Sequence, residues 1–448
     1  MDYKDLLNKL IEKGQEKMDE VEAFLVKNKQ LDIEIYKGEI DKYSLAESGG
    51  LSFRGSSQGK MGYSYTERLE ESALDSLVDE ALENSKYIEG SDDEIIFSGS
   101  ESYEEINHYD DSLNQVPTQD KINFLINLEK EAYSLDERVF AVNACAYQEF
   151  EGERYLVNSK GLDLHDKSNG GAAYIFVVVK DDEDTKTGIS YRIFYDFSSL
   201  DYKEIAKEAV DRAISMLGAS NIKSGNYPII IENTTFANLL SAFTPIFSSD
   251  NVQKGLSLLK GKLGEEIASP LLTIVDDPFL KGGFASRNFD DEGTASTFKT
   301  IVDNGKLVSF AYNWKTANRE GVASTGHASR SYKGPISIAP TNLYVVNGDL
   351  DLDEMMALAD KGLLINNLEG LHSGLNPVSG DFSLSASGYE IKDGKKARPV
   401  NQITIAGNLY EVFKNIVAVG NDLKFGLPSN GYIGSPSILV KSLAVSGE

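Results

Sequence analysis

The sequence predicts an α+β protein, with an α/β region over residues 1–220 followed by a β-rich domain over residues 221–448. The first observation behind this prediction is composition: 41% of the 448 residues are hydrophobic and 25% are charged, as in globular proteins with more than one domain. The second is charge. The first range holds 47 acidic and 24 basic residues, a net of −23, whereas the second holds 23 and 20, a net of −3. The third is an internal repeat within the first range.

The repeat consists of two related units, at about residues 4–87 and 118–217, and each unit is predicted to run helix, four strands, helix (α-β4-α). Both units open with an amphipathic helix, marked by Leu6, Leu7, Leu10 and Ile11 in the first and by Ile122, Leu125 and Leu128 in the second. Strand-like segments follow at 21–26, 33–44, 50–54 and 60–65 in the first unit. In the second unit they follow, with one segment more, at 139–142, 153–157, 161–164, 172–179 and 188–191. The closing helices, at 73–82 and 205–214, both place apolar residues at i, i+1, i+4, i+5, i+8 and i+9, the stripe of a helix that packs on a sheet. This shared order favours a duplication.

The remaining elements follow in chain order. Residues 86–120 contain ten acidic residues and one lysine, with glycine and serine interspersed, which predicts a solvated acidic connector between the two units. From residue 221 onward the sequence favours strands and tight turns. Hairpins are predicted at Asn304-Gly305, Asn347-Gly348 and Asp393-Gly394. Helices are predicted at 235–247, 352–361 and 410–415.

Charge and hydropathy exclude several classes of function. A formal net charge of −26 opposes a phosphate backbone, so we expect no nucleic-acid binding. The longest apolar run, Ala172 to Val179, is far shorter than the roughly 20 residues of a membrane span. The N-terminus has neither the basic start nor the apolar centre of a secretory signal, so we expect a cytoplasmic protein without membrane contact.

Common catalytic motifs are absent or lie in the wrong context. The closest two of the four histidines, His327 and His372, are 45 positions apart, which rules out two metal ligands on one helix turn. The single cysteine, Cys145, lies in a strand-like stretch and is interpreted as a buried core residue. Gly55 to Gly59 fits the G-x-S-x-G pattern of a serine nucleophile, but a strand pattern follows where that motif needs a helix, so a hairpin loop is favoured.

Two polar loops are candidates for binding. Residues 370–383 combine glycines with hydroxyl and amide side chains that suit an extended peptide, and a plain turn between strands explains the same composition equally well. Residues 286–293 place three consecutive carboxylates after Arg287. Binding of a hard cation is conceivable there, but the regular spacing of a calcium loop is missing, so an acidic turn is favoured.

At these loops the sequence resembles the TldD/PmbA family. The resemblance rests on ordered motifs at 289–293, 324–328, 379–389, 405–409 and 419–423, and it extends to the duplicated N-terminal region. It implies an α/β N-terminal region, a β-rich C-terminal domain, and cytoplasmic dimers that process peptides or small unfolded proteins. The family's older label, modulator of DNA gyrase, would then describe an indirect effect.

One branch of the family is excluded by missing residues. TldD-type subunits resemble zinc peptidases, with H-E-x-x-x-H on a helix and a later cysteine as third ligand. The corresponding helix here, Leu239 to Phe247, has neither histidine nor glutamate, and no cysteine follows Cys145. The resemblance therefore implies a PmbA-type, also called TldE-type, subunit that binds no zinc or other cofactor and is inactive alone. Its partner would be a zinc-bearing TldD-type subunit or a second copy of itself.

Two alternatives stay open at this stage. The chain could be an independent hydrolase with a non-zinc site around residues 370–383, or a scaffold that assembles with itself. No catalytic or metal-binding residue is predicted. The candidates for contact with a peptide or partner all lie in one loop: His372, Asn376, Ser379, Asp381 and Ser383.

Overall fold

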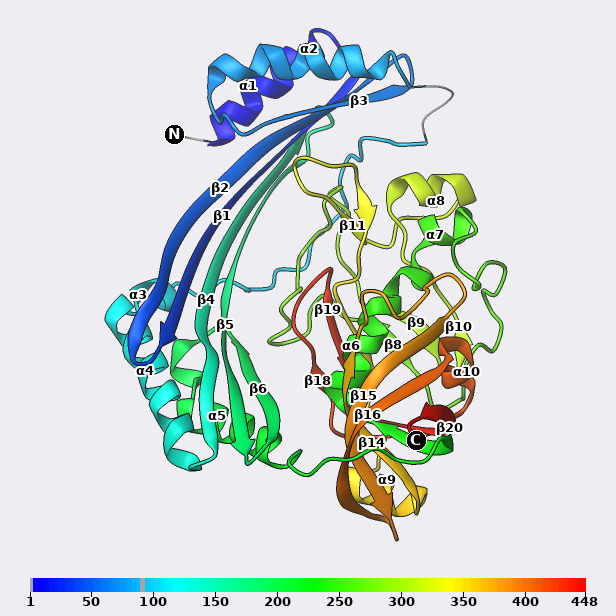
Figure 1. The fold of residues 1–448 in the computed structure, drawn as a ribbon. Helices are drawn as coiled ribbons and strands as arrows, with labels where there is room; N and C mark the ends of the chain where they lie inside the picture. The colour runs from blue at the N-terminus through cyan, green and yellow to red at the C-terminus, as the bar shows by residue number, and fades with distance from the viewer. Residues whose placement is uncertain (1–2, 89–92) are drawn as a thin grey trace.

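The computed structural model describes residues 3–88 and 93–448. Its first unit contains α1 (Tyr3–Gln15), β1 (Glu20–Tyr36), β2 (Glu39–Ser57), β3 (Lys60–Thr66), η1 (Glu71–Ala73) and α2 (Leu74–Ser85). The second contains α3 (Ser112–Gln115), α4 (Thr118–Leu135), β4 (Val139–Asn158), β5 (Asp163–Asp181), β6 (Asp184–Phe194), η2 (Phe197–Ser199) and α5 (Tyr202–Ile214). Their strands form one antiparallel sheet in the order β3-β2-β1-β4-β5-β6, which curves along one side of the molecule (Figure 1).

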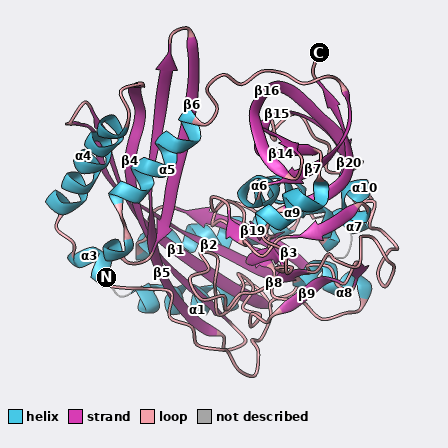
Figure 2. Cartoon of the chain, turned by 90° about the horizontal axis from the view of Figure 1, so that it is seen from below, coloured by secondary structure: helices cyan, strands magenta, loops and turns pink. Residues whose placement is uncertain are grey.

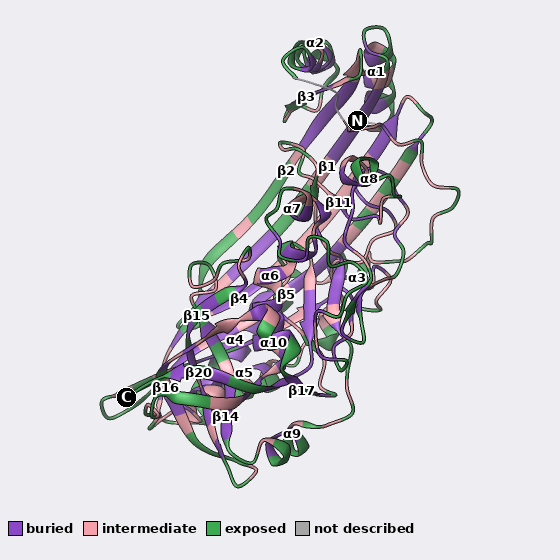
Figure 3. Cartoon of the chain, turned by 90° about the vertical axis from the view of Figure 1, so that its right-hand side faces the viewer, coloured by how far each residue is buried: buried purple, intermediate pink, exposed green. Residues whose placement is uncertain are grey.

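Each unit has three long strands, so the predicted α-β4-α order is wrong in its strand count. The segments at 21–26 and 33–36 belong to the single strand β1, which pairs with β2 from Glu20 opposite Ser56 to Tyr36 opposite Glu39. Residues 27–30 between them are polar, as in a loop, and their side chains are partly or fully exposed in the strand. Similarly, β2 passes from exposed at its start to buried beside the first helix pair (Figure 3). Backbone pairing continues where no helix covers the sheet, so polarity does not mark a strand end here.

A pair of helices covers each end of this sheet. At one end α1 and α2 pack on a core that includes Leu10, Leu51, Phe53 and Val78. At the other end α4 and α5 pack on the second unit's strands. The strands are long enough to serve both cores, because Ile33 of β1 lies in the second core and Val157 of β4 lies in the first. The two units therefore share one continuous sheet.

The C-terminal part, from residue 225 onward, is built mainly of short strands. Its elements are β7 (Gly225–Ile231), α6 (Asn233–Phe243), η3 (Thr244–Phe247), α7 (Ser249–Gln253), β8 (Ile274–Asp276), β9 (Lys299–Asp303), β10 (Lys306–Leu307), α8 (Trp314–Glu320), β11 (Ala328–Ser329), β12 (Ser337–Ile338), β13 (Asn342–Val345), α9 (Leu352–Ala359), β14 (Gly362–Glu369), β15 (Asp381–Lys392), β16 (Lys395–Asn408), α10 (Leu409–Lys414), β17 (Ile416–Val419), β18 (Lys424–Phe425), β19 (Tyr432–Ser435) and β20 (Ile438–Ser446). This composition confirms the predicted α+β class.

Two larger sheets organise this part. One has the order β10-β9-β8-β13-β19-β18, and the other has the order β16-β15-β14-β7-β20-β17. An additional pairing between β16 and β20 closes the second sheet into a barrel, which Figure 2 shows in cross-section. Helix α6 lies in the core that these sheets share, where Phe236, Leu239, Leu240 and Phe243 are fully buried. Among the described residues, no helix is both long and apolar enough to cross a bilayer.

Local turn chemistry explains which hairpins form. Asn304-Gly305 joins β9 to β10 and Asp393-Gly394 joins β15 to β16, and all four residues have positive φ, as the two-residue turn requires. The third predicted hairpin, at Asn347-Gly348, does not form. Instead the Gly348 N–H donates to the carbonyl of Gly420 (2.8 Å), and the chain continues into α9.

Residues 93–97 of the predicted connector are packed, whereas residues 86–88 and most of residues 101–120 are exposed, as the prediction of a solvated connector expects. Asp93 pairs with Arg319 (2.7 Å), Glu94 pairs with Lys315 (2.7 Å), and Ile96 is fully buried. The ring of Phe97 lies on Trp314, with 4.6 Å between ring centroids. These partners come from the C-terminal part, more than 200 positions away, so composition alone could not reveal them. The connector thus lies between the long sheet and the C-terminal part. Residues 89–92 of the predicted connector lie outside the described residues.

Candidate functional site

Two adjoining cavities form the candidate site. The first, which we call the η3 cavity, has a volume of about 510 Å³ and is lined by η3, α7, α8 and β12 and by Glu94 of the connector. The second, which we call the arginine cavity, has a volume of about 350 Å³ and lies between the long sheet and the C-terminal loops. Its wall includes Arg154, Arg287 and Arg330. Both cavities are lined by Pro340 and Asn430, so they meet at these residues.

The wall of the η3 cavity shows whether a metal would fit where the resemblance places one. The helix in question, α6 with η3, buries its apolar side chains in the core and presents Thr244, Pro245 and Phe247 to the cavity. A hydroxyl, a proline ring and a phenyl ring do not hold zinc, which takes thiolate, imidazole or carboxylate ligands. In the described part of the chain, no three His, Cys, Asp or Glu side chains are grouped so that they could hold a metal ion. The residues present therefore do not fit the zinc of the TldD-type branch.

One histidine, His327, lines the η3 cavity, and its ring is already engaged. Its Nδ1 lies 2.7 Å from the hydroxyl of Thr325, and its Nε2 lies 3.4 Å from a carboxylate oxygen of Asp276. Burial alone would raise the pKa of Asp276, but His327 and hydrogen bonds from Thr341 hold it below its ordinary value. The imidazole ring of His327 thus contacts the Thr325 hydroxyl on one side and the Asp276 carboxylate on the other, and these two contacts fix its orientation in the cavity wall.

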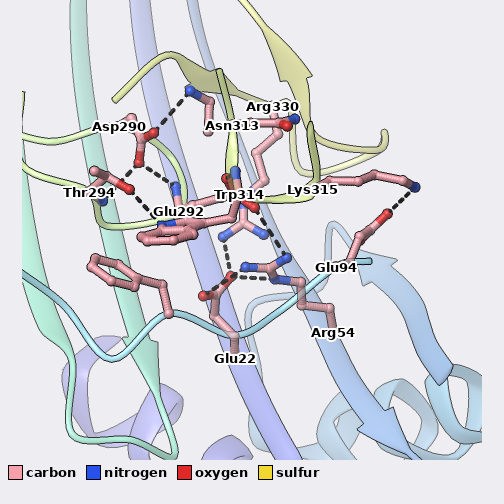
Figure 4. A network of polar contacts seen from close by, with 12 residues as sticks. Glu22, Arg54, Glu94, Asp290, Glu292, Thr294, Asn313, Trp314, Lys315 and Arg330 are labelled. Carbon is pink, nitrogen blue, oxygen red and sulfur yellow. Dashed lines mark hydrogen bonds and ion pairs between the residues drawn. The ribbon is translucent and has the colours of Figure 1, made fainter. Parts of the chain in front are cut away.

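A buried charge network joins the long sheet to the C-terminal part (Figure 4). On neighbouring strands, Arg54 Nε and Nη2 donate to the two carboxylate oxygens of Glu22, at 2.7 and 3.2 Å. Arg330, which follows β11, donates from Nη2 to the same Glu22 (2.8 Å). All three side chains are at least 97% buried. Burial would raise the pKa of Glu22, but the two guanidinium groups hold it below its ordinary value. One carboxylate therefore ties together two arginines from distant parts of the chain.

The acidic motif at 290–292 supplies three separate contacts. The Asp290 carboxylate accepts hydrogen bonds from the backbone N–H groups of Glu292, Thr294 and Ala328, at 2.9 to 3.0 Å, and so shapes the turn. Asp291 accepts from Arg154 of β4, at 2.6 Å. Because the carboxylates face different partners, they form a structural turn between the two parts of the protein rather than a cation site.

Glu292 is the third carboxyl of that motif, and its surroundings favour the neutral acid. It accepts the backbone N–H of Trp314 at 2.8 Å, and its other oxygen lies 3.8 Å from Arg54 Nη1. Burial raises its pKa to about 8; Arg54 opposes this rise, and Asp290 and Glu22 add to it. Burial likewise raises the pKa of Asp290. Two acids in one turn are therefore pushed toward the protonated state at the boundary of the two parts.

The five candidates predicted from the sequence lie apart from these cavities' linings: three are in the loop between β14 and β15, whereas Asp381 and Ser383 lie at the start of β15. His372, Asn376, Asp381 and Ser383 are exposed, and Ser379 is half-buried. The Asn376 carbonyl side chain accepts the N–H groups of Val378 and Ser379, and Asp381 accepts from Asn408 of β16. The Ser379 hydroxyl accepts the N–H of Asp381 (3.4 Å), so three of the five side chains make contacts within this segment and its neighbouring strand.

The glycines of this loop serve the same internal packing. A Cβ on Gly374 would lie 2.6 Å from the carbonyl oxygen of Ser383, and Gly380 has a φ of +83°. The close backbone approach expected from these glycines is thus made within the chain. Contact of the loop with a peptide or partner stays a prediction.

The residues that build the observed site carried a weak signal in the sequence. Glu22 and Arg54 are charged residues inside otherwise apolar strand segments, where a buried charge needs a partner. That pattern points to an ion pair but not to Arg330, which is 308 positions from Glu22. The cavities arise from loops far apart in the chain, and no local pattern predicts them.

The protein is a two-part α+β protein. One part is the long sheet with a helix pair at each end, the other contains the barrel, and a ligand-sized cavity lies between the two parts. The chain belongs to the PmbA/TldD family of metallopeptidases. Residues 21–85 match PmbA/TldA metallopeptidase domain 1, residues 111–217 match the central domain, and residues 224–447 match the C-terminal domain. The resemblance noted from the sequence is thereby confirmed.

Individual relatives agree along the full length. An uncharacterized protein of Methanocaldococcus jannaschii is 30% identical, over 97% of this chain and 98% of the relative. The metalloprotease PmbA of Escherichia coli O157:H7 is 24% identical, over 98% of this chain and 94% of the relative. Among solved structures, a candidate modulator of a DNA gyrase from Thermotoga maritima is 32% identical, with a TM-score of 0.91, and covers 99% of this chain and 100% of its own.

Proposed function

We propose that the chain is a PmbA/TldE-type subunit of a TldD/TldE-like metallopeptidase system, and that it holds peptides or small unfolded proteins without cleaving them. The observation that carries this proposal is the wall of the η3 cavity. Where the TldD-type branch carries its zinc ligands, this chain offers Thr244, Pro245 and Phe247. This chain has a cavity at that place but no zinc ligands on the helix, which suits binding without hydrolysis.

A free strand edge in the η3 cavity supports a peptide as the ligand. Ser337 and Ile338 of β12 line the cavity, and in the described structure β12 pairs only with β11, in a two-stranded sheet. A strand with an open edge can accept an extended peptide through main-chain hydrogen bonds, which tolerate many side chains. Such recognition fits a system that processes unfolded segments of varied sequence.

In this proposal the catalytic zinc belongs to a TldD-type partner, and the working unit is a dimer with that partner or with a second copy of this chain. We expect the contacts to draw on the C-terminal half, where the net charge is −3. The other half, at −23, repels a second copy of itself at low salt.

Reconstitution with a partner tests the proposal. An unstructured peptide with a fluorophore and a quencher is incubated with this chain alone, with a zinc-bearing TldD-type chain alone, and with both. We expect no cleavage by this chain alone, and faster cleavage by the mixture than by the partner alone. Cleavage by this chain alone, or a partner whose rate is unchanged by its presence while no complex forms on a sizing column, contradicts the proposal.

A further inference from the structure

The arginine cavity has a charge opposite to that of the protein as a whole. The sequence has a formal net charge of −26, yet this cavity is lined by three arginines and only two carboxylates, Asp166 and Asp291. Among the lining residues arginines therefore outnumber carboxylates by one, while Glu22, which lies outside the lining, pairs with Arg330. In a protein that repels anions over most of its surface, a cationic cavity selects them locally.

The two carboxylates of the wall are both taken by Arg154. Its Nη1 donates to Asp291 (2.6 Å), and its Nε and Nη2 donate to one oxygen of Asp166 (3.1 and 2.9 Å). The other oxygen of Asp166 lies 2.9 Å from His108 Nε2. Arg154 is thus neutralised within the wall and Arg330 is paired with Glu22, so Arg287 is the arginine of the wall that has no ion pair among the described residues.

Arg287 is the arginine that makes no direct ion pair, although its charge also acts on the buried Asp290 and lowers the pKa of that carboxyl against the effect of burial. Its Nη1 and Nη2 donate to the carbonyl oxygens of Ala328 and Gly326, at 3.2 and 3.1 Å, and its Nε is buried without a hydrogen-bond partner. Within the described residues it forms no ion pair shorter than 4 Å. Arg330 adds to the local field, because it shares its only carboxylate, Glu22, with Arg54. A guanidinium that is held in place by neutral carbonyls and lines a cavity is suited to an incoming carboxylate, whose two oxygens match its planar fork.

The remaining wall and the neighbouring cavity indicate what carries the carboxylate. Phe24, Phe150 and Phe284 line the same cavity and offer aromatic surface to an apolar side chain. Through Pro340 and Asn430 the cavity meets the η3 cavity, where the β12 edge is open. A peptide bound along that edge therefore lies in a cavity that adjoins the one lined by the arginines.

We propose that the arginine cavity binds a carboxylate group of the bound peptide, with Arg287 as the residue that recognises it. The inference rests on the proposed function, because it assumes that the cleft holds a peptide. The carboxylate can come from the C-terminus of the peptide or from an acidic side chain, and both have the same chemistry.

The experiment compares three fluorescein-labelled peptides of alanine and phenylalanine by fluorescence anisotropy. One ends in a free carboxylate, one ends in an amide, and one ends in an amide but contains an internal glutamate. They are titrated with the full-length chain, alone and with a TldD-type partner. The variants are Arg287→Gln, Arg287→Lys and, as a control, Arg398→Gln. Arg398 lies on β16, where it is exposed and paired with Glu390, and it does not line the cavity.

We expect wild type to bind at least one carboxylate-bearing peptide about tenfold or more tightly than the peptide without one, and less selectively at high salt. If only the peptide with a free C-terminal carboxylate binds more tightly, the recognised group is the C-terminus. If the peptide with the internal glutamate also binds more tightly, the cavity accepts an acidic side chain. Arg287→Gln should abolish the preference, whereas Arg287→Lys keeps part of it and Arg398→Gln keeps all of it.

Equal binding of all three peptides to wild type overturns the carboxylate inference and leaves the proposed peptide-holding function intact. This comparison requires no variant, so it decides even if Arg287→Gln does not fold. A preference that persists in folded Arg287→Gln also overturns the inference. Failure of every peptide to bind, with or without the partner, overturns the proposed function as well.

Discussion

Glu292 allows the buried charge network to be tested quantitatively. Its pKa is raised to about 8, chiefly by burial, so the folded protein holds it as a neutral acid below that pH, whereas the unfolded chain ionises it near pH 4.5. The stabilising contribution of the protonated carboxyl is therefore complete below about pH 4.5 and is lost as the pH rises to about 8. Through most of this range the loss is roughly 1.4 kcal/mol per pH unit, and it tapers near the folded pKa, so it amounts to about 3.5 kcal/mol between pH 5 and 8.

The substitution Glu292→Gln isolates this effect, because glutamine has the shape of the neutral acid and does not titrate. We predict that wild type loses about 3.5 kcal/mol of unfolding free energy relative to Glu292→Gln between pH 5 and pH 8. The assay is urea unfolding followed by the fluorescence of Trp314, the only tryptophan, whose backbone N–H contacts Glu292. If the stability difference between the two proteins is constant from pH 5 to 8, Glu292 is ionised in the folded state and the reasoning is wrong.

Glu22 offers a matched contrast. The same change, Glu22→Gln, removes an ionised carboxylate and leaves Arg54 and Arg330 buried without it, which costs about 3–5 kcal/mol at pH 7. Two glutamates in one network should thus respond in opposite ways to the same substitution. A loss below about 1 kcal/mol for Glu22→Gln contradicts the assignment of its charge.

Three further predictions concern other parts of the molecule. Asn376→Ala should lower the unfolding free energy by about 1 kcal/mol, because the Asn376 side chain accepts hydrogen bonds from two backbone N–H groups of its loop. Unchanged stability together with weaker binding of a peptide or partner would show a binding role instead. Burial raises the pKa of the Cys145 thiol, so a thiol reagent should modify it only when urea unfolds the protein, and rapid labelling of the native chain would place it elsewhere. Lys315→Ala should lower the unfolding free energy by about 1–3 kcal/mol and speed proteolysis of the connector, because it leaves Glu94 buried without this partner. The control Lys414→Ala, at an exposed pair, should lower it by less than about 0.5 kcal/mol. Equal effects of the two substitutions would refute the docking of the connector.

The sequence predicts best where burial is local and periodic. The closing helices were expected at 73–82 and 205–214, and α2 and α5 cover Leu74–Ser85 and Tyr202–Ile214, because one helix face packs on one sheet. Strand number was misjudged because residues 27–30 of β1 are polar where no helix layer covers the sheet. The short helices α7 and α8 were missed because they are too short for a repeating apolar stripe.

The candidate site depends on contacts that no local pattern records. The pairing of Glu22 with Arg330 and the docking of Glu94 on Lys315 each join residues more than 200 positions apart. The charged residues inside apolar strands were a usable sign of buried pairs. Which partners they meet, and that a cavity forms beside them, depends on how the C-terminal loops pack on the long sheet.

The missing zinc ligands are the central claim, and the zinc content of the purified chain tests it most directly. The chain is incubated with excess zinc, dialysed to remove loosely bound ions, and measured by elemental analysis together with a zinc-bearing TldD-type protein treated in parallel. The account predicts far less than one zinc per chain, because the wall at Thr244, Pro245 and Phe247 supplies no ligand. A value near one zinc per chain, with cleavage of an unstructured peptide that a chelator abolishes, would contradict it.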